Sequence, residues 1–184
     1  MTQAQESLTV LTRFVDGYLD AVNTAMDALT DEKTPEPARR VLATALNYVL
    51  DLLDIFPDHY QGLGVADDAM LLRLAARQAV TAGAAQGALR ELAKEAADVE
   101  MVLGDLAAPL EKYLDQLAGR TVRGRTVSQI LSDKVVFGSF ANDVQRQVAG
   151  YKAKPIDATL SADYHVGELK RMVRSALKKA GLVA

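Results

Sequence analysis

Residues 8–29 read LTVLTRFVDGYLDAVNTAMDAL, and the periodicity of this stretch decides the fold class. Its apolar side chains recur at alternating spacings of three and four residues, at Leu8, Leu11, Val15, Tyr18, Val22, Ala25 and Leu29. This spacing places them along one face of an α-helix. The opposite face carries Arg13, Asp16, Asp20 and Asp27. The stretch therefore predicts an amphipathic helix that packs inside a bundle or, in a homodimer, against a second copy.

The same periodicity continues along the chain between glycines and prolines. It predicts further helices at residues 38–56, 67–82, 89–103, 106–117, 126–131, 135–148 and 161–180. Gly104 and Pro109 are expected to break or kink the helical region around them, and residues 152–160 to form a linker. Abundant Ala and Leu allow close approach of helix axes. We therefore predict an all-α, single-domain bundle of about six to eight helices, with a Pro-Asp turn between the second and third helices.

Cysteine is absent from the chain, which removes disulfides, thiolate chemistry and Cys-based zinc sites. That absence fits a reducing compartment. The first ten residues lack the basic start and apolar run of a signal peptide. The longest apolar-looking stretch, residues 41–56, contains Asp51 and Asp54 and is shorter than the ~20 apolar residues of a membrane span. The sequence thus predicts a cytoplasmic protein.

Charge is distributed unevenly along the chain. Residues 1–119 hold 9 basic and 19 acidic side chains, whereas residues 120–184 hold 12 basic and 5 acidic ones. We predict an acidic helical bundle over 1–119 with a basic helical section, 120–184, packed on it. The basic side chains of interest in that section are Arg120, Arg123, Arg125, Lys170, Arg171, Arg174, Lys178 and Lys179.

These basic side chains have two interpretations. They either pair with the acidic bundle, or they contact an anionic surface. A phospholipid surface suits the basic amphipathic pattern of residues 161–180. Nucleic acid is disfavoured by a pI of about 5.4 and by the scarcity of aromatic residues.

Residues 48–68 form the most distinctive motif, YVLDLLDIFPDHYQGLGVADD. Pro57 cannot continue the preceding helix, and Asp58 can accept backbone N–H bonds in the turn. Gly64 suits a left-handed or close-approach position. Asp67 is predicted to cap the next helix, with Asp68 in its positively polarised first turn. On this interpretation the motif ends one helix and starts another.

The motif resembles the signature of the YkvA-like family, a bacterial domain of unknown function. Tyr48, Asp54, Pro57, Asp58, Gly64, Asp67 and Asp68 fall at matching positions without a gap. The chain departs from the family pattern at Leu52 and Gln61, where prolines are usual or frequent. The resemblance covers residues 38–80 and implies a helical hairpin and, as in many short members, membrane association. It implies no enzymatic activity.

A second interpretation gathers the motif carboxylates around a cation. Asp54, Asp58, Asp67 and Asp68 would offer oxygen ligands, which favour Mg²⁺ or Ca²⁺. Their spacing matches no known calcium loop. His59, in the same turn, could serve as a base or a ligand beside them, although a turn histidine is usually a surface or capping residue. Titration with Mg²⁺ or Ca²⁺ separates the two interpretations.

No nucleophile elbow, phosphate loop or other catalytic constellation is present in the sequence. The leading functional hypothesis is therefore a non-enzymatic helical interaction or scaffold module with a protein partner. The first alternative is a peripheral membrane protein that uses the basic C-terminal helix. The second alternative is a divalent-metal protein or enzyme that uses the motif aspartates.

Overall fold

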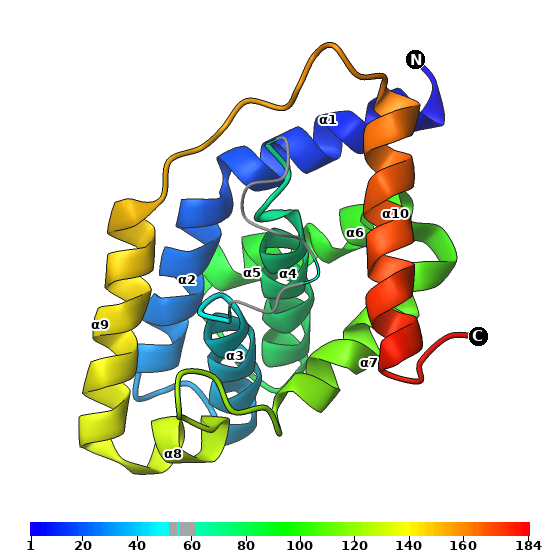
Figure 1. The fold of residues 1–184 in the computed structure, drawn as a ribbon. Coiled ribbons are helices and arrows are strands. Elements are labelled where there is room, and N and C mark those ends of the chain that lie inside the picture. Colours follow the sequence, from blue (N-terminus) through cyan, green and yellow to red (C-terminus); the bar gives the residue numbers. More distant parts are fainter. Residues whose placement is uncertain (52–54, 56–61) are drawn as a thin grey trace.

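The computed structural model describes residues 1–51, 55 and 62–184, and every regular element within these ranges is a helix. The helices pack into one bundle (Figure 1). Over the same ranges, β pairing is limited to an isolated bridge between Val122 and Arg125. The predicted all-α bundle is confirmed.

The predicted 8–29 helix is divided into α1 (Gln3–Asp16) and α2 (Tyr18–Thr30). The division falls at Gly17, whose backbone leaves the helical region at φ −88° and ψ 10°. Glycine is unfavourable inside a helix because it has the most conformational freedom to lose. The expectation of one continuous helix was wrong, but the apolar stripe still faces the core from both segments.

Helices α3 (Glu36–Tyr48) and α4 (Ala66–Thr81) pack on each other at the centre of the bundle (Figure 1). Every side chain from 66 to 76 is buried, as expected of a helix surrounded by other helices. The expectation that α3 extends to Phe56 was wrong. It ends at Tyr48, and the N–H groups of Leu50 and Asp51 then bond to carbonyls three residues earlier, at Asn47 and Tyr48, in place of the helical pattern. The Pro-Asp turn itself lies outside the described residues.

The next part of the chain forms α5 (Gly87–Lys94), α6 (Ala96–Leu103), the short 3₁₀ turn η1 (Gly104–Leu106) and α7 (Ala107–Leu117). The predicted break at Gly104 is confirmed, since this residue adopts a φ of 62°. Pro109 lies in the first turn of α7, where its missing N–H leaves no helical hydrogen bond unmade. The proline therefore does not divide the helix.

The basic section contributes α8 (Val127–Ser132), α9 (Lys134–Gly150) and α10 (Ala162–Lys179). Thr126 and Gln129 form a capping box at the start of α8, and the Ser161 side chain caps α10, so both helices begin where their predicted ranges do. Helix α10 packs against α1 and α7, on the side of the bundle opposite α9 (Figure 1). None of the described helices combines the length and apolar composition that crossing a membrane requires.

The linker between α9 and α10 packs closely against the turn that precedes α4. Gly62 has a φ of 81°, and a Cβ atom there would lie 2.5 Å from the Pro155 carbonyl oxygen and 2.7 Å from the Ile156 Cα. The Nε2–H of the buried His165 ring donates a 2.9 Å hydrogen bond to the Asp157 carbonyl oxygen and so holds the same linker from α10. Gly62, two residues before Gly64, thus combines a left-handed backbone with a close approach of the linker.

We predict that Gly62→Ala destabilises the fold by at least about 2 kcal/mol, because the left-handed backbone alone costs a side chain roughly 1–2 kcal/mol and the linker backbone must also move. Chemical denaturation followed by circular dichroism measures this change. Gly138→Ala is the matched control: Gly138 lies within α9 with open space around it, so alanine should stabilise the protein by about 0.5–1 kcal/mol. Equal effects of the two substitutions would contradict the packing described for Gly62.

Candidate functional site

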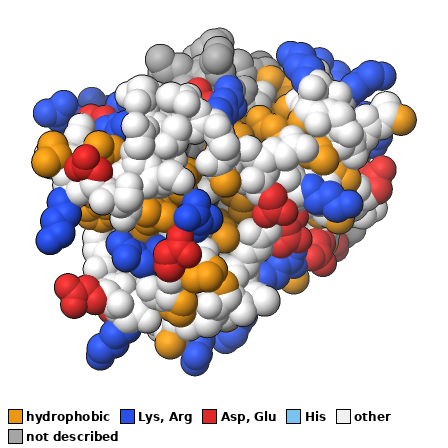
Figure 2. All heavy atoms as spheres, turned by 90° about the horizontal axis from the view of Figure 1, so that it is seen from below, with side chains coloured by type: hydrophobic (Ala, Val, Ile, Leu, Met, Phe, Trp, Pro, Cys, Tyr) orange, Lys and Arg blue, Asp and Glu red, His pale blue; other side chains and the backbone are white. Residues whose placement is uncertain are grey.

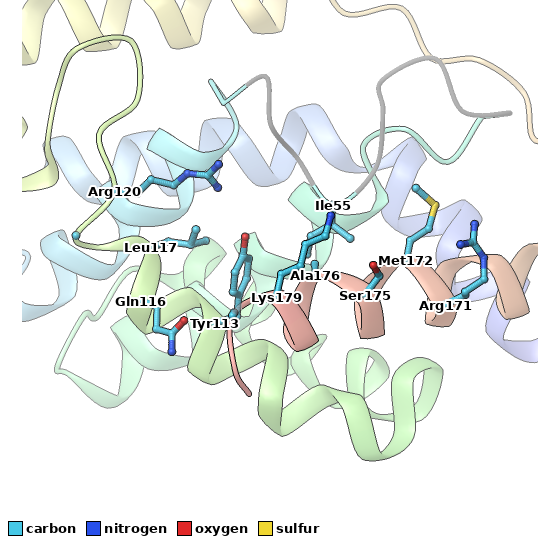
Figure 3. Close-up of a pocket in the computed structure, with 12 residues that line it drawn as sticks. Ile55, Tyr113, Gln116, Leu117, Arg120, Arg171, Met172, Ser175, Ala176 and Lys179 are labelled. Carbon is cyan, nitrogen blue, oxygen red and sulfur yellow. The ribbon is translucent and has the colours of Figure 1, made fainter. Parts of the chain in front are cut away.

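A groove with a volume of about 740 Å³ opens between α7, α10 and the loop that follows α7. Ligand pockets in proteins occupy roughly 300–1,000 Å³. Helix α7 contributes Tyr113, Gln116 and Leu117 to the lining, the loop contributes Gly119 and Arg120, and Ile55 joins them. Helix α10 forms the other wall with Arg171, Met172, Ser175, Ala176, Lys179 and Ala180. Figure 3 shows how these side chains surround the groove.

Helix α10 presents two parallel rows of side chains to this groove. Arg171, Ser175 and Lys179 are spaced four residues apart and are exposed. Residues with this spacing are neighbours on one helix face. The adjacent row, Met172, Ala176 and Ala180, is half-buried and forms an apolar floor. The groove therefore combines a cationic edge with an apolar surface.

The opposite wall of the groove is a polar network anchored on Asp51. The Nε atom of Arg120 lies 3.0 Å from the Asp51 Oδ2 atom, and this carboxylate is largely buried. Burial raises the pKa of the Tyr113 phenol. The Arg120 guanidinium lowers this pKa, but the Asp51 and Asp67 carboxylates raise it again, so the net shift is upward. Tyr113 is therefore a neutral hydroxyl near pH 7, suited to hydrogen bonding.

The three cations of the groove differ in their ionic surroundings. Arg120 is paired with Asp51, and the Arg171 guanidinium forms a two-point contact with Glu168, at 2.9 and 2.8 Å. Lys179 is exposed, and no carboxylate oxygen among the described residues lies within 4.0 Å of its ammonium group. Lys179 is thus the groove cation with the least compensated charge.

The motif carboxylates that the structure describes are buried at the start of α4. Asp67 Oδ2 accepts hydrogen bonds from the Tyr48 hydroxyl at 2.7 Å and from the Ile55 N–H at 3.0 Å. The Tyr48 oxygen also accepts from the Ile55 N–H, at 2.8 Å. Burial, followed by the negative charges of Asp67 and Asp68, raises the pKa of Tyr48 well above its usual value. Tyr48 therefore stays protonated and donates to Asp67.

One detail of the motif differs from expectation. Val65 is the N-cap of α4, so the prediction that Asp67 caps this helix was wrong; Asp67 lies one residue inside the helix start, where its carboxylate binds groups outside α4. Asp68 lies in the first turn, as predicted, and is buried. Asp54, Pro57, Asp58 and His59 lie outside the described residues. Among the residues that are described, no group of three possible metal ligands is found.

Ile55 connects the motif with the groove. Its backbone N–H is held by Tyr48 and Asp67, and the same residue lines the groove. The motif residues thus position one wall of the groove. The sequence pattern placed Ile55 in a helix and so did not indicate this relation, and it did not indicate the groove because α7 and α10 are distant in sequence. The sequence did contain one indication of the groove. Met172, Ala176 and Ala180 form a second apolar row beside the main apolar stripe of α10.

The other predicted surface cations are distributed differently. Arg125 is 8% exposed, and it pairs with Asp143 at 2.6 Å and donates to Ser139, so it is not available to an anionic surface. The exposed Arg123 donates to the Leu50 carbonyl at 3.0 Å and ties this loop to the end of α3. Arg120, Arg171 and Lys179 line the groove.

The remaining three cations, Lys170, Arg174 and Lys178, lie on α10 outside the groove lining. Arg174 approaches Asp105 at 3.4 Å, and Lys178 is exposed. At the end of the bundle that is lowest in Figure 1, basic and acidic side chains are interspersed, with hydrophobic side chains visible between them (Figure 2). Lys178 is adjacent to Lys179 in the sequence but lies outside the groove. Substitution of Lys178 is therefore a control for the loss of a positive charge that does not alter the groove.

In comparisons with known proteins, no family model matches the chain, and no curated protein and no solved structure matches it either. The YkvA-like resemblance of residues 38–80 therefore stays a prediction from the motif residues.

We predict that Asp67→Asn lowers the free energy of unfolding by about 1–3 kcal/mol, because the amide leaves buried hydrogen-bonding groups poorly matched. The melting temperatures of the unmodified protein and of Asp67→Asn are measured by thermal unfolding, with and without millimolar Mg²⁺ or Ca²⁺. If the motif serves helix termination, neither cation shifts the melting temperature of the unmodified protein. A cation-dependent rise in melting temperature that disappears in Asp67→Asn would instead support the metal hypothesis.

Proposed function

We propose that this protein is a non-enzymatic interaction module whose contact surface is the groove between α7 and α10. One observation supports this proposal most. Helix α10 presents an exposed row of side chains, with a cation at each end, directly beside a half-buried apolar row. Apolar surface beside charged and polar side chains is typical of protein–protein contact surfaces. The rest of the bundle acts as the scaffold that holds the two walls.

The chemistry of the described groove residues favours binding over catalysis. The guanidinium groups of Arg120 and Arg171 carry hydrogen-bond donors and no acceptor, which suits them to binding an anionic group. Tyr113 has a raised pKa, which opposes its use as a base near neutrality. The YkvA-like resemblance is compatible with this proposal because it implies no enzymatic activity, and the absence of Cys fits a cytoplasmic setting.

We predict that Lys179→Glu weakens capture of groove-dependent partners about tenfold, whereas Lys178→Glu leaves capture unchanged. Both substitutions reverse one charge in the last turn of α10, but Lys179 alone of the two lines the groove. The measurement is quantitative affinity capture from native lysate on the immobilised protein and both variants, with unchanged melting temperatures as the folding control. A partner set retained equally by all three proteins would contradict the proposal.

A peripheral membrane role is the second candidate, supported by the exposed Arg171, Arg174, Lys178 and Lys179 on one outer helix. The apolar residues Leu169, Val173 and Leu177 of this helix are fully buried in the bundle. An amphipathic helix that binds membranes needs its apolar face for insertion. Membrane contact by the folded protein would therefore depend on electrostatic attraction alone.

For that second candidate we predict co-sedimentation with vesicles that contain anionic phospholipid, and none with neutral vesicles. Raising the salt concentration to about 0.5 M should release the protein, since the Debye length then falls well below 10 Å. Lys178→Glu and Lys179→Glu should reduce binding equally, because adsorption through surface charge does not depend on the groove. Equal sedimentation with neutral and anionic vesicles would exclude this mechanism.

A further inference from the structure

We infer that the occupant of the groove is an acidic amphipathic helix of a partner protein. This inference rests on the proposed function, because it names the chemistry of the partner for the same groove. It is carried by three features of the described residues: how the cations are spread, where the apolar row lies, and which elements form the walls.

The cations are spread along the groove. Arg171 and Lys179 are eight residues apart on α10, which corresponds to about 12 Å along the helix axis. Arg120 lies on the opposite wall, and Figure 3 shows the two arginines toward different ends of the view. A single phosphate or carboxylate is bound best where several donors converge on one point. Cations in a line instead suit a ligand that carries several separated negative charges.

The apolar row runs parallel to this line of charge. Met172, Ala176 and Ala180 form the half-buried floor, and Leu117 and Ile55 add apolar surface from the other side. Methionine is an adaptable contact residue for aliphatic partners. The ligand therefore needs an aliphatic face along its length as well as carboxylates, a combination that a nucleic acid backbone does not offer. An amphipathic acidic peptide meets both requirements.

The walls of the groove are helices, which favours a helical ligand. Side chains four residues apart on α10 form a ridge, and a partner helix packs such a ridge into its own i, i+4 groove. Helix-in-groove recognition reads apolar anchors at this spacing. A partner helix lying along α10 would place aliphatic residues over Met172 and Ala176. Its carboxylates, seven or eight residues apart, would face Arg171 and Lys179.

The test uses three fluorescein-labelled model helices of about 18 residues, or about 27 Å. The first has Leu and Ala on one face and Glu on both flanks. The second replaces Glu by Lys, and the third keeps Glu but replaces Leu by Ser. Fluorescence anisotropy is measured against the full-length protein and the variants Lys179→Glu, Lys178→Glu and Met172→Gln, each checked for an unchanged melting temperature.

We expect only the Glu/Leu helix to bind measurably. Lys179→Glu should weaken its affinity about tenfold, Met172→Gln should weaken it severalfold, and Lys178→Glu should change it less than twofold. Added salt should weaken binding, because the contact is partly electrostatic. Unlabelled anionic vesicles and an unlabelled single-stranded oligonucleotide are the competitors, and neither should displace the helix at equal charge concentration.

Several results would overturn the inference. Equal losses with Lys178→Glu and Lys179→Glu would indicate unspecific surface attraction, and equal binding of the Glu/Ser helix would remove the role of the apolar row. Absence of binding at about 1 mM peptide would also overturn it. If the model helices fail but lysate capture still depends on Lys179, the acidic-helix inference falls while the proposed function stands. If neither depends on Lys179, both fall.

Discussion

The arrangement of the site depends on one buried carboxylate. Asp67, fully buried in the first turn of α4, accepts hydrogen bonds from the Tyr48 hydroxyl at the end of α3 and from the Ile55 N–H. A buried carboxylate is tolerated only where such donors compensate its lost hydration. These contacts fix the end of α3, the start of α4 and the position of Ile55 together. Because the Ile55 side chain lines the groove, the same interaction also positions the groove wall.

The attachment of the basic C-terminal section does not depend mainly on charge. Among the described residues, the ion pairs Arg120–Asp51 and Arg174–Asp105 cross between the acidic and basic sections, whereas Arg125–Asp143 and Arg171–Glu168 lie within the basic section. An exposed pair contributes only about 0–1 kcal/mol. By contrast, each fully buried Leu or Val side chain of α10 contributes roughly 1.5–3 kcal/mol. Apolar burial therefore holds α10 in place, while Lys178 and Lys179 stay exposed on its outer face.

Local signals in the sequence predicted the parts of the fold that local interactions decide. The capping box of Thr126 and Gln129 and the Ser161 cap were predictable because their hydrogen bonds span three residues. The end of α3 at Tyr48 was not, because the hydrophobic pattern continues beyond it while Asp67, nineteen residues later, binds the Tyr48 hydroxyl. Gly62 and Gly64 could not be distinguished from sequence, since the linker that approaches Gly62 comes from residues 155 and 156. The groove likewise depends on the packing of distant helices.

The groove itself follows from the size of two side chains. Helix α10 has a fully buried row, Leu169, Val173 and Leu177, and an exposed row that contains Arg171 and Lys179. Between them lie Met172, Ala176 and Ala180. Larger apolar residues at the two alanines would bury more surface and stabilise the contact with α7. Alanine leaves that space open, so the volume beside Met172 is a direct consequence of sequence. The proposed function gives these small side chains a role, because a partner that enters the groove would cover the apolar floor that they form with Met172.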